Sequence, residues 1–144
     1  MPTRTARTIW SGEPSDGGGT VQFVTSSSPA VDFSRAGRVG ARAAGSATPE
    51  ELLAGAHSSC LAMELAALLH DAGATVHGLD VTADVTLSAD ESGRHSVRDV
   101  LLEVSGDVIG IEPAAFVDLA QEAGRTCPMS RALSDVAVRV DASV

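Results

Sequence analysis

The sequence has no lysine and no tyrosine, and aromatic residues make up 3% of its 144 residues. All ten basic residues are arginines, and the formal net charge is −9. A chain this acidic repels a phosphate backbone, and so few aromatic side chains offer no platform on which bases could stack. We therefore expect no nucleic-acid partner and no binding to an anionic membrane.

Targeting signals and long apolar runs are also scarce. Residues 3–10 alternate polar and basic side chains and lack the apolar stretch of a signal peptide. No segment approaches the ~20 apolar residues that a membrane-spanning helix needs. These absences predict a cytoplasmic protein with no membrane partner.

Only two cysteines are present, Cys60 and Cys127. Two are too few for a disulfide scaffold, and a reducing compartment would not maintain a structural bridge. If the two sulfur atoms pair, we expect the bond to be transient and chemical. Serine-hydrolase and phosphate-loop chemistry is excluded, because the sequence has neither Gly-x-Ser-x-Gly nor a glycine-rich loop that ends in lysine.

Length and composition fit one domain, residues 1–144, with 44% apolar residues. A monomer of this size buries only about 68–70% of the surface of its unfolded chain, so pairing with a second copy would add stability. The sequence therefore predicts a single domain that forms a homodimer.

The apolar periodicity predicts an α+β fold with antiparallel sheet and a long central helix. We expect strands over 3–10, 20–25, 31–33, 79–88, 97–108 and 136–140, and helices over 52–71, 113–123 and 128–133. Glycines 17–19 are expected to supply positive φ in the first hairpin turn, and Gly124 to end the second helix. Residues 35–47 lack periodicity and predict an exposed loop.

The long helix has a recognisable start. Thr48 can act as its N-cap, Pro49 suits the first helical position, and Glu50 and Glu51 complement the positive end of the helix dipole. The apolar pattern ends before Gly73, which predicts the end of the helix.

The two cysteines allow different interpretations. Cys60 lies within the long helix, where a buried and inert thiol is the favoured interpretation from position alone. Cys127 precedes Pro128 at the start of a short helix, where backbone N–H groups and the dipole favour the thiolate. A simple capping role for Cys127 explains the same position, and the residues alone leave both interpretations open.

A reactive thiolate needs a cation beside it, and the cation needs a partner to hold it. Arg35, Arg38 and Arg42 precede the long helix, and Glu50 and Glu51 begin it. Solvated charges on a loop and at a helix start would produce the same pattern.

A metal site is weakly indicated. His57 and Cys60 are three residues apart on the helix, but no second ligand pair at zinc spacing follows. Cys127 with His70 or His77 would have to converge through folding alone. We expect no metal.

Two motifs resemble the OsmC/Ohr family (osmotically inducible protein C and organic hydroperoxide resistance). The run 48–60, Thr-Pro-Glu-Glu-Leu through small residues to Cys60, is similar to the family's signature helix, and Cys127-Pro128-Met129-Ser130 to its second motif. The strand pattern over 79–87 and the opening Trp-Ser-Gly at 10–12 also resemble the OsmC branch. His57 favours that branch, because Ohr proteins usually have tyrosine there.

The resemblance implies an OsmC-like fold, with antiparallel sheets wrapped around a long central helix in an intertwined homodimer. It implies a thiol peroxidase that reduces organic hydroperoxides, and hydrogen peroxide as well, in oxidative or osmotic stress defence. Cys60 would attack the peroxide, and Cys127 would resolve the sulfenic acid into a disulfide. An external dithiol reductant, such as a lipoyl-type dithiol, would restore both thiols. No cofactor is implied.

By motif position, Glu50 matches the family's active-site glutamate, which holds an arginine. Arg35 matches by following the third predicted strand and is slightly preferred, whereas Arg38 matches by its distance from Pro49. Met129 replaces the usual branched aliphatic residue and leaves the acyl-chain preference open. The alternative from another class is a non-catalytic dimeric module that binds a lipid-like molecule at the interface.

Overall fold

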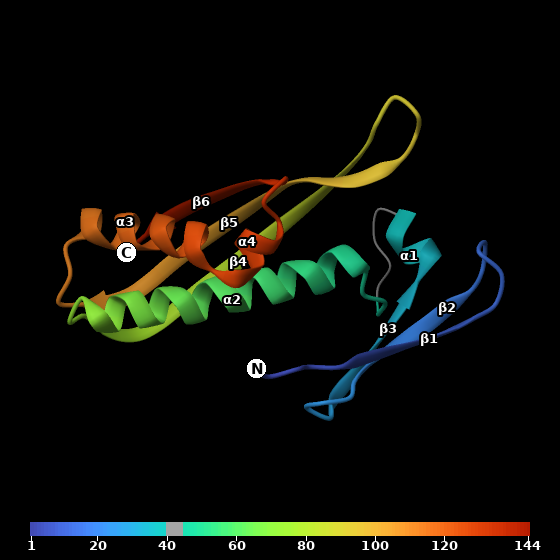
Figure 1. The fold of residues 1–144 in the computed structure, drawn as a ribbon, viewed down its shortest axis with the longest axis horizontal. Helices are drawn as coiled ribbons and strands as arrows, with labels where there is room; N and C mark the ends of the chain where they lie inside the picture. The colour runs from blue at the N-terminus through green and yellow to red at the C-terminus, as the bar shows by residue number, and fades with distance from the viewer. Residues whose placement is uncertain (40–44) are drawn as a thin grey trace. The chain divides into compact units, whose positions relative to one another are not determined.

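The computed structural model describes residues 1–39 and 45–144, and the chain forms two compact units, Met1–Leu52 and Leu53–Val144. The predicted α+β class is confirmed (Figure 1). The elements in chain order are β1 (Ala6–Ser11), β2 (Gly18–Phe23), β3 (Ser28–Ser34), α1 (Arg35–Val39), α2 (Pro49–Asp71), β4 (Thr75–Ala89), β5 (His95–Ile109), α3 (Pro113–Thr126), α4 (Pro128–Ala132) and β6 (Ala137–Ser143).

The first unit contains an antiparallel sheet in the order β1-β2-β3. Gly18 and Gly19 lie in β2 and pair with the neighbouring strands, so the prediction that they supply the turn is wrong. The positive φ in this connection belongs to Gly12, at 89°. At Gly19 a Cβ would lie 2.8 Å from the Phe33 ring, which explains why glycine is needed within the strand.

The predicted loop over 35–47 begins instead with a short helix, α1. The Ser34 hydroxyl accepts a hydrogen bond from the Gly37 N–H at 3.0 Å, which stabilises this turn in a segment with little apolar periodicity. Residues 40–44, including Arg42, lie outside the described residues. The chain resumes with Ala47, whose N–H donates to the Asp32 carbonyl at 2.8 Å.

Helix α2 begins and ends where the sequence predicts. The Thr48 hydroxyl accepts a hydrogen bond from the Glu51 N–H at 3.1 Å, as an N-cap does. Gly73 follows the helix with φ of 79°, a conformation that favours glycine. The prediction of a helix with a capped start and a glycine end is confirmed.

The core of the second unit lies between α2, α3 and the second sheet. Leucines at four-residue spacing on α2 are fully buried and meet Phe116 and residues of β5, in a cluster that includes Leu61, Leu65, Leu69, Val100 and Leu102. A stripe repeating every four residues covers one side of a helix. Helix α2 is therefore held on that side, and its other sides are less buried.

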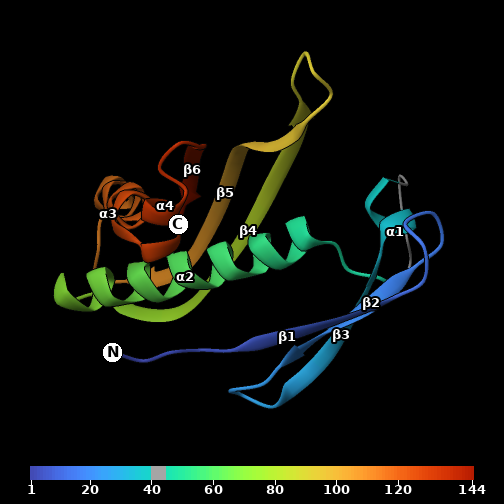
Figure 2. The same cartoon turned by 45° about the vertical axis from the view of Figure 1, so that its right-hand side comes forward.

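The second sheet has the order β4-β5-β6 (Figure 2). Strands β4 and β5 are antiparallel, as predicted, and form a long hairpin. Strand β6 pairs with β5 in parallel, unlike the expected antiparallel arrangement. Helices α3 and α4 separate β5 from β6, and a helical crossover of this length lets the chain return in the same direction.

Helix α3 continues through Gly124 to Thr126, so the prediction that Gly124 ends it is wrong. Gly124 is buried, and a Cβ there would overlap the Val140 Cγ2 methyl group of β6. The absence of a side chain thus permits close packing of α3 against β6, and the local sequence could not distinguish this role from a helix end.

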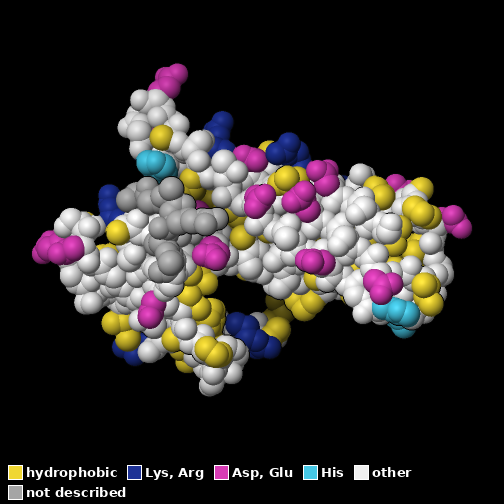
Figure 3. Space-filling view, turned by 180° about the vertical axis from the view of Figure 1, so that it is seen from behind, with side chains coloured by type: hydrophobic (Ala, Val, Ile, Leu, Met, Phe, Trp, Pro, Cys, Tyr) yellow, Lys and Arg dark blue, Asp and Glu magenta, His cyan; other side chains and the backbone are white. Residues whose placement is uncertain are grey.

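Helix α2 is long and apolar enough to cross a membrane by length and composition, with a mean hydropathy of 1.5. The prediction that no segment approaches such a stretch is therefore wrong. Core helices share this length and composition, and the leucine stripe of α2 belongs to the core. Acidic side chains are spread over the face seen in Figure 3, in keeping with the net charge of −9.

Candidate functional site

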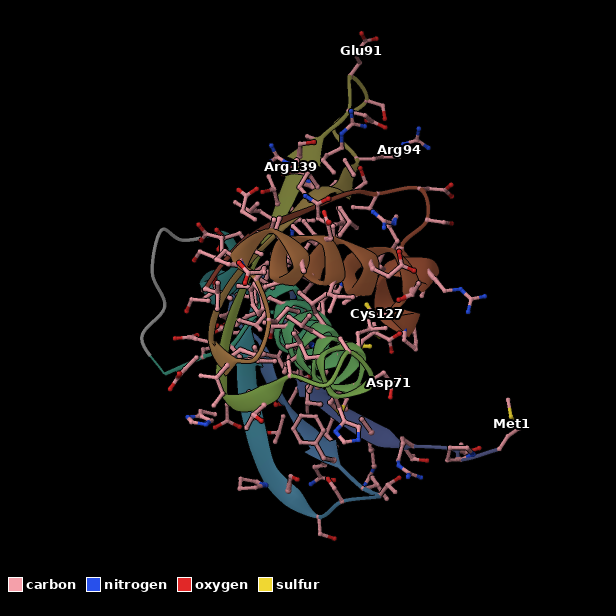
Figure 4. The ribbon with its side chains drawn as sticks, turned by 90° about the vertical axis from the view of Figure 1, so that its left-hand side faces the viewer. Met1, Asp71, Glu91, Arg94, Cys127 and Arg139 are labelled. Carbon is pink, nitrogen blue, oxygen red and sulfur yellow. The ribbon has the colours of Figure 1, made fainter. Side chains whose placement is uncertain are left out.

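The two cysteines lie close together in the second unit. Cys60 is on α2 and partly exposed, whereas Cys127 is fully buried between α3 and α4 (Figure 4). Both are free thiols. The Cys127 side chain neighbours Cys60 closely enough to alter its ionisation. The structure thus brings together two thiols, Cys60 and Cys127, that are 67 positions apart in the sequence.

The surroundings of Cys60 favour its neutral form. Burial raises the pKa of the Cys60 thiol, and the neighbouring Cys127 and the Glu64 carboxylate act in the same direction. The backbone N–H of Met129 hydrogen-bonds to the Cys60 sulfur and opposes them. A stable thiolate at Cys60 therefore requires a cation in addition to these groups.

Cys127 is the N-cap of α4. Its sulfur accepts a hydrogen bond from the Ser130 N–H at 3.4 Å, so the capping interpretation describes its geometry. The same sulfur lies 3.1 Å from the Ser130 hydroxyl. Capping and chemistry are compatible here, because both use the groups that would stabilise a thiolate.

His57 is also in contact with this cluster, one turn before Cys60 on α2. Its Nε2 atom lies 2.7 Å from the Ser130 hydroxyl oxygen. The ring is fully buried, and burial lowers the pKa of His57, so the imidazole is neutral near neutral pH. His57 was considered as a metal ligand from the sequence, and Ser130 was given no role. The Cys-x-x-Ser spacing at the start of α4 is the signal that could have identified Ser130.

Arg38 and Glu50 form an ion pair in the first unit. Arg38 Nε and Nη2 donate to Glu50 Oε1 at 3.0 and 2.6 Å. Burial alone would raise the pKa of the Glu50 carboxyl, but the hydrogen bonds and positive charge of Arg38 outweigh it and lower the pKa. Glu50 therefore stays ionised and fixes the guanidinium. Of the two candidate arginines, Arg38 is the one with this contact among the described residues.

A cavity of about 240 Å³ lies beside this ion pair, within the first unit. Trp10 and Phe33 supply its aromatic walls, with ring centroids 5.8 Å apart. Arg35 and Arg38 also line it, so Arg35, which was slightly preferred over Arg38 as the arginine held by Glu50, borders the same space. The cavity combines apolar walls with two guanidinium groups.

The weak indication of a metal site finds no support in the described part of the chain. Residues 1–39 and 45–144 contain no group of three or more histidine, cysteine or acidic side chains able to hold an ion. His57 Nε2 instead contacts the Ser130 hydroxyl, and the Nδ1 atom of the exposed His77 lies 3.9 Å from Asp107 Oδ2.

The fold and the site define the class of protein. It is an α+β protein with two neighbouring free thiols in its second unit and an Arg38–Glu50 ion pair in its first unit. Residues 42–142 match the family model of OsmC-like protein. The chain therefore belongs to the OsmC-like family, as its motifs suggested.

Relatives and solved structures agree with this assignment. The chain is 36% identical over 85 residues to proteins named peroxiredoxin OsmC from Escherichia coli K12 and Shigella flexneri, a match over 59% of this chain and 59% of each relative. An OsmC-like protein of unknown function from Vibrio cholerae has a TM-score of 0.82 at 17% identity, with 99% of both chains covered. An organic hydroperoxide resistance protein from Elizabethkingia anophelis, with thiocyanate bound, has a TM-score of 0.79 at 24% identity, covering 99% of this chain and 96% of that one.

Proposed function

We propose that this protein is a cysteine-based thiol peroxidase that reduces organic hydroperoxides. The observation that carries the proposal is the proximity of Cys60 and Cys127, two free thiols on different elements. The names of the curated relatives, peroxiredoxin OsmC, support the same reaction. We place its role in cytoplasmic defence against oxidative or osmotic stress.

In the first step the Cys60 thiolate attacks the peroxide O–O bond. One oxygen is transferred to the sulfur as a sulfenic acid, and the other leaves as an alkoxide that takes up a proton to become an alcohol. Cys60 is the attacking thiol in this proposal because it is the partly exposed one, whereas Cys127 is fully buried.

In the second step the Cys127 sulfur attacks the sulfenic sulfur of Cys60. A disulfide forms, the S–O bond breaks, and the hydroxyl group leaves as water. An external dithiol, such as a lipoyl-type dithiol, then reduces the disulfide by two thiol–disulfide exchanges and is itself oxidised to a disulfide. The reaction needs no bound cofactor.

We assign Arg38 as the cation that stabilises the Cys60 thiolate and the leaving alkoxide, with Glu50 holding it in place. The surroundings of Cys60 in the second unit raise its pKa, so a guanidinium must supply the missing stabilisation. Arg38 is preferred over Arg35 because Arg38 is held by two hydrogen bonds to an ionised carboxylate.

The cavity of the first unit supports organic hydroperoxides as the substrate class. The Trp10 and Phe33 walls suit an alkyl or aryl chain, and the guanidinium groups suit the polar peroxide end. Hydrogen peroxide has no alkyl or aryl chain, so it would contact only the guanidinium groups. We therefore propose that organic hydroperoxides react faster than hydrogen peroxide.

We further propose that residues 1–144 form one domain that acts as a homodimer. Helix α2 carries exposed apolar side chains opposite its leucine stripe, including Met63 at 69% exposure. A second copy would cover such a surface. Light scattering coupled to size-exclusion chromatography should give about twice the mass of the chain, 14.6 kDa.

The proposal is tested by mass spectrometry after addition of one equivalent of cumene hydroperoxide to the reduced protein. We expect a Cys60–Cys127 bridge, seen as a loss of two hydrogen atoms and as a linked peptide pair after digestion. The cysteine-free double variant is the control. A protein that leaves the peroxide intact and keeps both thiols would contradict the proposal.

The raised pKa of Cys60 is opposite in direction to the lowered pKa that a peroxidase thiol needs, so the thiol pKa distinguishes the peroxidase from the non-catalytic binding module. Titrating Cys60 alkylation against pH in the Cys127→Ser variant separates the two hypotheses. A thiol pKa clearly below the usual ~8.5 indicates a peroxidase. A pKa at or above that value, together with binding of a fatty acid without turnover, indicates a binding module.

A further inference from the structure

His57, Ser130 and Cys127 form a continuous row of polar atoms inside the second unit. The His57 Nε2 to Ser130 Oγ distance is 2.7 Å, and Ser130 Oγ lies 3.1 Å from Cys127 Sγ. His57 and Cys127 are fully buried, and Ser130 is 8% exposed. The row joins α2 to the start of α4, and Cys60 neighbours Cys127 at its end.

The row has a chemically meaningful direction. Burial lowers the pKa of His57, so the ring is an uncharged base. With the proton on Nδ1, the free Nε2 accepts from the Ser130 hydroxyl, and the Ser130 oxygen can then accept from the Cys127 thiol. Every hydrogen bond in this arrangement runs from the sulfur toward the imidazole.

Burial of the His57 imidazole reduces the free energy of unfolding. Its Nδ1 atom is buried and has no hydrogen-bond partner among the described residues. An unsatisfied buried polar group costs about 1–3 kcal/mol, a cost that an apolar side chain at position 57 would avoid. A side chain with only a packing role would not need an imidazole here, which points to a chemical use of Nε2.

We propose that Ser130 and His57 form a proton relay that takes the proton from Cys127 when this thiol attacks Cys60, an assignment that rests on the proposed disulfide-forming function. Ser130 touches the reacting sulfur and is the catalytic residue of the relay. His57 is a positioning residue that acts through Ser130 and receives the proton.

The proton balance of the relay is simple. The Cys127 S–H proton passes to Ser130 Oγ as the Ser130 hydroxyl proton passes to His57 Nε2. Cys127 sulfur bonds to Cys60 sulfur, and the hydroxide that leaves Cys60 takes the proton back from the imidazolium through Ser130. The net change is one thiol and one sulfenic acid converted to one disulfide and one water.

The relay meets a need that the second step creates. Only the thiolate form of Cys127 attacks efficiently, and Cys127 is fully buried. The Ser130 N–H, 3.4 Å from the sulfur, stabilises the negative charge that develops as the proton leaves. Ser130 thus contributes its backbone to the charge and its hydroxyl to the proton transfer.

A test without peroxide separates this inference from the proposed function. 2,2′-Dithiodipyridine converts exposed Cys60 to a mixed disulfide and releases one thiopyridone. Attack by Cys127 then releases a second thiopyridone in a slower phase, and the Cys127→Ser variant should lack that phase. The rate of the second phase reports the activation of Cys127 alone.

His57→Gln is the decisive variant, because glutamine keeps a hydrogen-bond acceptor for Ser130 but is not a base near neutral pH. We expect the second phase to slow by at least about tenfold, since positioned general bases contribute roughly 10²–10⁴-fold. Ser130→Ala should slow it similarly, and Ser130→Thr should restore it. The first phase should change less than about twofold in all three, because none alters Cys60.

A second phase as fast in His57→Gln and Ser130→Ala as in the unmodified protein would overturn the relay. Peroxide consumption is measured on the same samples. If the unmodified protein consumes no peroxide, the proposed function fails, while the thiopyridone phases still decide whether the relay activates Cys127.

Discussion

The two polar clusters of this protein differ in almost every physical respect. The Arg38–Glu50 pair is charged, and its arginine side chain is 45% exposed. The His57–Ser130–Cys127 row is buried, and burial lowers the pKa of His57, which favours the uncharged imidazole. An accessible cation can meet a substrate and is screened by solvent, whereas a buried row of hydrogen-bonding groups can pass a proton along its members without contact with bulk water.

The difference suggests a division of labour in the proposed reaction. In the proposed mechanism the charged pair would act in the first step, in which negative charge develops on the peroxide oxygen. The buried row would act in the second step, in which one buried thiol must lose a proton. Variants in each cluster should therefore affect different steps, and the following experiments test that separation.

The largest effect is expected from the thiols themselves. Cys60→Ser should reduce peroxide consumption by more than about 10³-fold, because the hydroxyl is a far weaker nucleophile than a thiolate. Cys127→Ser should allow one turnover and then accumulate a Cys60 sulfenic acid, detectable as a dimedone adduct by mass spectrometry. Equal peroxidase rates in both variants would remove the distinction between the two steps.

The next largest effect should come from the charged pair. Arg38→Ala should lower the second-order rate constant for cumene hydroperoxide by about 10²–10³-fold, the usual loss when one group that stabilises transition-state charge is removed. Arg35→Ala is the matched control, because Arg35 lines the same cavity without being assigned to hold Glu50. A larger loss in Arg35→Ala would reverse the assignment. Stopped-flow measurement of the first step under single-turnover conditions gives both constants.

The contrast between packed and open positions can be measured at two glycines. Gly124→Ala should destabilise the protein by about 1–3 kcal/mol, because the added methyl group would overlap Val140. Gly55 lies at an exposed position of α2, and a Cβ there would meet no atom within 4 Å. Gly55→Ala should therefore stabilise the protein by up to about 1 kcal/mol. Urea unfolding followed by circular dichroism gives both values, and equal effects would show that Gly124 is not tightly packed.

The smallest predicted effects concern pH. Folding lowers the pKa of His57, so the unfolded chain binds a proton first as the pH falls below about 6.5, and stability is lost from that pH downward. Folding also lowers the pKa of Glu50, whose contribution is present above about 4.5 and is lost as the pH falls further. His57→Gln should flatten the stability curve between pH 7 and 5, and Glu50→Gln only below about pH 5. Urea unfolding at half-unit pH intervals would detect a reversed order.

Much of the fold could be predicted because local signals and the final structure agree. Thr48 caps α2 and Gly73 ends it, as their residue types indicate. The alternating apolar and polar residues predicted as strands over 79–88 and 97–108 form the β4–β5 hairpin. These features depend on neighbours a few residues away, so a sequence pattern contains the necessary information.

Other features depended on contacts between distant residues. Gly124 looked like a helix end, but Val140 on β6 requires the missing side chain. Arg35 and Arg38 were nearly equivalent as partners of Glu50, and only the turn of α1 decided between them. No local pattern indicates that His57 contacts Ser130, because the two residues are 73 positions apart.

By itself, the sequence determined the α+β class, the family, the long helix with Cys60 and the capping position of Cys127. The tertiary structure decided which arginine pairs with Glu50, that β6 runs parallel to β5, and that His57 is connected to Cys127 through Ser130. The physical reason is range: periodicity and capping act over one or two turns, whereas hydrogen bonds and close packing between elements form only after the chain has folded.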